Sequence, residues 1–126
     1  MNTIGFKINY QVKQKQKFEK FLNRFKSEIG YELINLKIEK YYKIENQFQA
    51  RFYIEARNKT EEKLVYEVLK LSNKLWSSGN LNWVFNGPHE FENIIFECIL
   101  NNENDDQPLK WAHIELNHNN QNSAER

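Results

Sequence analysis

The spacing of apolar residues changes along the chain in a way that few folds can satisfy. Between residues 3 and 12 every second position is apolar, which predicts a strand with one buried face. From Lys13 the spacing changes to three and four, and the apolar residues become Phe18, Phe21, Leu22, Phe25 and Ile29. That spacing predicts an amphipathic helix that ends at Gly30. The chain therefore begins as a strand followed by a helix.

The same change of spacing occurs a second time. Residues 31–44 and 47–56 alternate as two strands around a turn at residues 45–47, and Asn58 or Thr60 can cap a second helix that ends at Gly79. A further strand is expected at residues 81–86. This order is the split βαβ, or ferredoxin-like, pattern of an α+β fold. We expect an antiparallel sheet with both helices on one face and the other face open.

Two more strands, at residues 94–100 and 109–116, form a C-terminal hairpin that either extends the sheet or folds across its edge. No linker or composition break divides residues 1–117, so we expect a single domain there. Residues 118–126 are polar and have nothing to bury, which predicts a mobile tail.

Composition restricts the class of protein. The chain has 126 residues, of which 40% are hydrophobic, and no apolar run reaches the roughly 18 residues of a membrane span. Cys98 is the only cysteine, so it cannot form an internal disulfide, and it is expected to be a packing residue in a reducing compartment. These features predict a cytoplasmic protein that does not contact a membrane.

Charge is distributed unevenly behind the formal net charge of +1. Residues 1–30 carry +5, residues 31–79 carry +2, and residues 80–126 carry −6. The acidic end includes Glu103, Asp105 and Asp106, in the loop that joins the last two strands. Segregated charge can steer a partner of opposite sign, although short acidic loops are commonly only solvated.

The last strand should divide its side chains between two faces. Ala112, Ile114 and Leu116 would point into the core, which leaves Trp111, His113 and Glu115 on the open side. A solvent-facing tryptophan beside loop carboxylates can act as an anchor surrounded by a steering rim. The predicted partner-binding residues are Glu103, Asp105, Asp106, Trp111, His113 and Glu115.

No pattern of catalytic or metal-binding residues is present. The four glycines are scattered and form no phosphate-binding loop, and the possible zinc ligands His89, Cys98, His113 and His118 have no recognised spacing. Cys98 is expected on the core side and His113 on the open side, which separates the one conceivable nucleophile and base. We therefore expect no enzyme activity, no cofactor and no metal.

RNA binding is the natural alternative for an open sheet face. Tyr53 is the one aromatic residue suitably placed on the third strand, and the first strand offers Lys7, Asn9 and Gln11 instead. The acidic hairpin would repel phosphate, which argues against a nucleic-acid partner. A small RNA- or ligand-binding regulatory domain that uses the open face remains the alternative, supported by the basic first helix.

A small α+β domain without a catalytic motif, rich in Asn, Lys, Ile and Glu, with exposed aromatics and an acidic patch near one edge, resembles the immunity proteins of bacterial polymorphic toxin and contact-dependent growth inhibition systems. The resemblance implies a stoichiometric inhibitor that blocks the active site of one cognate toxin domain, often a nuclease. Acidic residues on the partner face would then mimic phosphate and speed association with a basic toxin.

Overall fold

The chain folds as an α+β protein, and its described residues form two helices and a six-stranded sheet. A computed structural model describes residues 2–57, 60–75, 83–87, 94–102 and 107–117. The helices are α1 (Lys15–Ile29) and α2 (Glu61–Leu75). The strands are β1 (Thr3–Gln11), β2 (Ile34–Lys40), β3 (Gln47–Glu55), β4 (Trp83–Asn86), β5 (Ile94–Asn101) and β6 (Leu109–Asn117). None of the described helices is long and apolar enough to cross a membrane.

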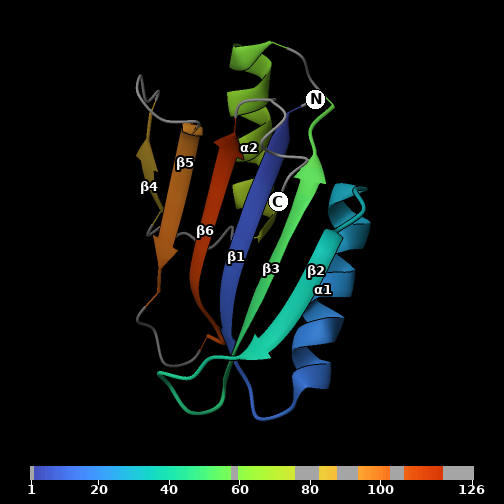
Figure 1. Cartoon of the computed structure of the whole chain (residues 1–126), viewed down its shortest axis with the longest axis vertical. Coiled ribbons are helices and arrows are strands. Elements are labelled where there is room, and N and C mark those ends of the chain that lie inside the picture. The colour runs from blue at the N-terminus through green and yellow to red at the C-terminus, as the bar shows by residue number, and fades with distance from the viewer. Residues whose placement is uncertain (1, 58–59, 76–82, 88–93, 103–106, 118–126) are drawn as a thin grey trace.

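The sheet is antiparallel throughout and open, with the strand order β2-β3-β1-β6-β5-β4. The predicted ferredoxin-like order, in which the strand at 81–86 pairs with the first strand, is not confirmed. Instead β6 pairs with β1 along its length, and β4 pairs with β5 at the far edge (Figure 1). The C-terminal hairpin therefore lies inside the sheet. A four-residue β4 provides little apolar surface for a central position, whereas β5 and β6 provide eight and nine residues.

Both helices cover the same face of the sheet, as predicted, and the opposite face faces the viewer in Figure 1. The helix α1 lies behind the β2–β3 side, and α2 lies behind β6 (Figure 1) and also contacts β5. We call the uncovered side the open face. Because β1 and β6 occupy the middle of the sheet, this arrangement pairs the first strand of the chain with the last one.

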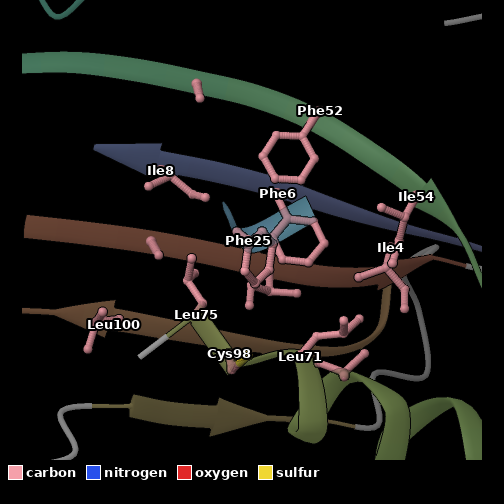
Figure 2. Packing of buried hydrophobic residues seen from close by; sticks show 14 of the residues in the cluster. Ile4, Phe6, Ile8, Phe25, Phe52, Ile54, Leu71, Leu75, Cys98 and Leu100 are labelled. Carbon is pink, nitrogen blue, oxygen red and sulfur yellow. The ribbon is translucent and has the colours of Figure 1, made fainter. Parts of the chain in front are cut away.

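The core lies between the helices and the sheet. Alternate residues of β1 are buried, and Phe6 stacks on Phe52 of β3 at a ring-centroid distance of 4.8 Å. Phe25 of α1 packs edge-on against Phe6 at 5.8 Å, so one phenylalanine joins helix and sheet (Figure 2). The predicted core residues Phe18, Phe25, Val68, Leu75, Ala112, Ile114 and Leu116 are all buried.

Local signals explain most element ends. Gly30 adopts a left-handed conformation with a φ of 71° and donates its N–H to Lys26 O, which closes α1 as predicted. Thr60 accepts a hydrogen bond from the Lys63 N–H at its Oγ1, so it caps α2. The predicted strand 31–44 shortens to β2. Inside β2, Asn35 has a φ of 56° and the register shifts between Ile34 and Lys37, so the strand is irregular near its start. The predicted helix end at Gly79 lies outside the described residues.

Candidate binding face of the sheet

Polar residues of β1, β3 and β6 alternate with core residues and gather on the open face. In β1 they include Lys7 and Asn9, and in β3 they include Gln49 and Arg51. This follows from the period of two in a strand, since Phe6, Ile8, Ala50 and Phe52 occupy the positions between them and are buried.

The pairing register brings four basic residues into one line across the open face. Lys7 lies opposite Arg51 on one side and opposite His113 on the other, and Arg51 lies opposite Lys37. We call Lys37, Arg51, Lys7 and His113 the basic row. Four adjacent strands contribute to it, at a strand spacing of about 4.8 Å. Like charges directly opposite one another destabilise a sheet, so the row is not explained by packing.

A chain of side-chain hydrogen bonds runs beside the basic row. The Arg51 Nε and Nη2 groups donate to Gln49 Oε1 at 3.2 and 3.1 Å. Gln49 Nε2 in turn donates to Asn9 Oδ1 at 2.8 Å. Asn9 is only 6% exposed, which makes it one of the few buried polar residues of the described chain. The guanidinium of Arg51 is thus held by the Gln49 amide of its own strand, which is in turn bonded to Asn9 of the neighbouring strand.

Two hollows cover much of the open face. One is a groove of about 760 Å³ that contacts Lys7, Asn9, Arg51, Lys110 and Trp111. The other is a hollow of about 1100 Å³ around Lys7, Lys37, Arg51, Tyr53 and His113. Since Lys7 and Arg51 line both, the two hollows meet at the centre of the basic row.

Three of the predicted partner-binding residues lie where the sequence placed them. Trp111, His113 and Glu115 are half-buried on the open side of β6, and Trp111 and His113 have ring centroids 6.1 Å apart. The other three, Glu103, Asp105 and Asp106, lie outside the described residues. The structure therefore brings together the aromatic and histidine part of the predicted site.

His113 has a defined partner. Its Nε2 lies 2.9 Å from Glu97 Oε1 of β5, and both side chains are largely shielded from solvent. Glu97 also lies directly opposite Glu115. Most cations of the open face therefore lie on β2, β3 and β1, and a pair of carboxylates lies on β5 and β6, although Glu39 of β2 and Lys110 of β6 also line the hollows.

Cys98 points away from this face. It is buried in the core cluster beneath α2 (Figure 2). Burial, and to a lesser extent the nearby Glu97 carboxylate, raise the pKa of the Cys98 thiol to about 12. The thiol is therefore protonated at neutral pH. Within the described ranges, no cluster of three or more His, Cys, Asp or Glu side chains has the geometry to hold a metal ion.

Sequence reasoning missed the basic row, although it placed Lys7 and Asn9 on the open side of the first strand. Their alternation with apolar residues shows the face on which they lie, but it does not show which residue stands opposite. The correct strand order and register are needed to place Lys7 between Arg51 and His113.

Comparison with known proteins gives no relative: no family model, no curated protein and no solved structure matches this chain.

Proposed function

We propose that this protein is a non-catalytic binding protein whose open sheet face takes an anionic ligand. The observation that carries the proposal is the basic row, in which Lys7 stands between Arg51 and His113 at the meeting point of two hollows. Directly opposed like charges, as in Lys7 with Arg51 and Arg51 with Lys37, destabilise a sheet, and an anion placed between them removes that cost. Binding of a negatively charged ligand would therefore offset the repulsion within the basic row.

The side chains around the row support binding rather than catalysis. The Cys98 thiol is buried and protonated, and the His113 ring is engaged by Glu97. Arg51 is oriented by Gln49, as expected for a group that recognises an anion with fixed geometry. We place the protein in the cytoplasm, where a single reduced cysteine is the normal state.

Inorganic polyphosphate is a suitable probe for this proposal. We expect wild-type protein to bind it with an affinity that falls as salt rises, because phosphate contacts by lysine and arginine release counterions. Reversing the charge with Lys7→Glu should weaken binding by about tenfold or more, since it replaces an attraction by a repulsion. The matched control is Lys20→Glu, an identical change at an exposed position of α1. Equal losses in the two variants would show that binding reflects net charge and not the row.

A second candidate is the inhibition of a cognate bacterial toxin domain, as an immunity protein. The observation that favours it is the half-buried Trp111, which lies on the open face with His113 and Glu115. An aromatic residue in such a setting is the usual anchor of a protein interface. The sequence predicted an acidic binding face that contacts a basic toxin. The basic row would instead contact an acidic surface of the toxin.

The product of the neighbouring reading frame tests this candidate. If it is the toxin, Trp111→Ala should speed dissociation and cost about 2 kcal/mol of binding while the protein stays folded. If the dissociation rate of the Trp111→Ala complex equals that of wild type, Trp111 does not belong to the interface. The exposed Tyr66 of α2, changed to Ala, is a control that should leave the complex unaffected.

A further inference from the structure

The groove of about 760 Å³ at one end of the open face combines features that bear on the identity of the ligand. Asn9 and Arg51 form part of its floor. Tyr42 and Lys43, from the segment between β2 and β3, contribute one part of the lining, and Lys110 and Trp111 contribute another. In Figure 1 the segment between β2 and β3 extends from the tip of β2 across the end of the sheet. The groove therefore has a polar floor with cations and aromatic rings around it.

The hydrogen-bond chain in the floor ends at an available donor. Asn9 accepts from Gln49 through Oδ1, and no described residue accepts a hydrogen bond from its Nδ2. Asn9 is 94% shielded from solvent, yet it lines the groove, so its Nδ2 is a largely buried donor that is reached from the groove. A ligand oxygen in the groove would complete the chain that starts at Arg51.

An irregularity in β6 adds a cation at the same place. Asn9 pairs with Trp111 and Tyr10 pairs with Leu109, so Lys110 is the extra residue of a bulge. Bulges redirect side chains and are common beside binding sites. Because of the bulge, both Lys110 and the adjacent Trp111 line the groove.

Aromatic rings flank the groove at two points. Trp111 is half-buried on β6, and Tyr42 is 85% exposed in the segment between β2 and β3. A tyrosine exposed to that extent gains nothing from the core. Aromatic rings next to cations are the elements that bind single strands, because a base stacks on the ring while its phosphate contacts the cation.

We propose that this groove binds single-stranded nucleic acid, with phosphates on Lys7 and Arg51, a base stacked on Trp111, and a base oxygen accepting from Asn9 Nδ2. The inference rests on the proposed anion-binding function and narrows its ligand. A base-paired duplex keeps its bases stacked inside and leaves Trp111 without a partner. A protein ligand fits less well, because lysine is depleted from protein interfaces and this groove contains several lysines.

Fluorescence anisotropy with a labelled oligouridylate of about ten nucleotides tests the inference at low salt. The unlabelled competitors are the same strand, a duplex of the same length and inorganic polyphosphate. We expect the single strand to compete about tenfold better than either of the others, since only the single strand gains from stacking.

Substitutions of groove residues test whether the ligand binds in the groove. Trp111→Ala should weaken binding about tenfold, and Trp111→Phe should retain most of it. Lys7→Gln should reduce the slope of log affinity against log salt by about 0.7, the value for one phosphate contact with a single strand. Asn9→Asp, which replaces the donor by a carboxylate of the same shape, should weaken binding about tenfold or more. Lys20→Gln on α1 removes the same charge away from the groove and should have no effect.

The outcomes separate the two proposals. If polyphosphate competes as well as the single strand and Trp111→Ala is silent, the open face binds anions and the nucleic-acid inference is wrong. If neither ligand binds, both proposals are wrong. If Lys20→Gln weakens binding while Lys7→Gln does not, the ligand lies on α1 and the groove is excluded. Binding by a toxin domain with no affinity for the single strand would favour a protein ligand instead.

Discussion

Cys98 shows how burial determines the chemistry of a single side chain. The thiol is fully shielded in the core, and its pKa is raised to about 12 by burial and by the Glu97 carboxylate. Below about pH 8.5 the thiol is protonated in both the folded and the unfolded chain. At higher pH the unfolded chain releases the proton and the folded chain keeps it. The folded state then binds more protons, so its stability falls as the pH rises toward about 12.

This cysteine makes a measurable contribution to alkaline unfolding. Between about pH 9 and pH 12, stability should fall by up to about 1.4 kcal/mol per pH unit from Cys98 alone. Cys98→Ala should remove this contribution to the slope of the free energy of unfolding against pH. The free energy is measured by denaturant unfolding at several pH values. Burial also raises the pKa of Tyr10, so Tyr10 contributes to the loss of stability at alkaline pH as well. The variant Tyr10→Phe measures that second contribution. An identical slope in wild type and Cys98→Ala would contradict the assignment. Ligand binding by Cys98→Ala should be unchanged.

Individual residues of the site were predictable only in part. The alternation in the last strand places Trp111, His113 and Glu115 on the open face, and the structure agrees. The contact between His113 and Glu97 was not predictable, because it joins two strands diagonally and depends on the register of β5 and β6. The buried Asn9 was also missed, since a polar residue in an alternating strand normally indicates solvent.

At the scale of elements, the sequence predicts the strands and helices better than it predicts their neighbours. Periodicity, together with the apolar run at 94–100, identifies the eight elements of the described residues, and Gly30 and Thr60 mark helix ends that the structure confirms. Strand order depends on which long apolar strand fills the centre of the sheet. Either β4 or β6 could pair with β1, and β6 does so in the structure. The local sequence of each strand does not determine which of the two pairs with β1.

Amide hydrogen exchange tests this strand order. In the observed sheet β6 has neighbours on both sides, so the amides of Ile114 and Leu116 should exchange as slowly as those of Ile8 in β1. Val84, in the edge strand β4, should exchange many times faster. The ferredoxin-like order would give the reverse, with a protected Val84 and a rapidly exchanging β6.

At the scale of the whole molecule, the position of β6 determines the electrostatics of the open face. Because β1 pairs with both β3 and β6, Lys7 lies between Arg51 and His113. The open face then has most of its cations on β2, β3 and β1, and carboxylates at Glu97 and Glu115 on β5 and β6 and at Glu39 on β2. Such a face orients an approaching ligand as well as attracting it.

The central claim is that the open face binds an anion at the basic row. Its most direct measurement is the change in backbone amide chemical shifts when the protein is titrated with inorganic tripolyphosphate at low salt. The largest changes should occur at Lys7, Arg51 and Lys37, with little change at Lys15 and Lys20 of α1. Changes centred on α1, or no changes at millimolar ligand, would contradict the claim.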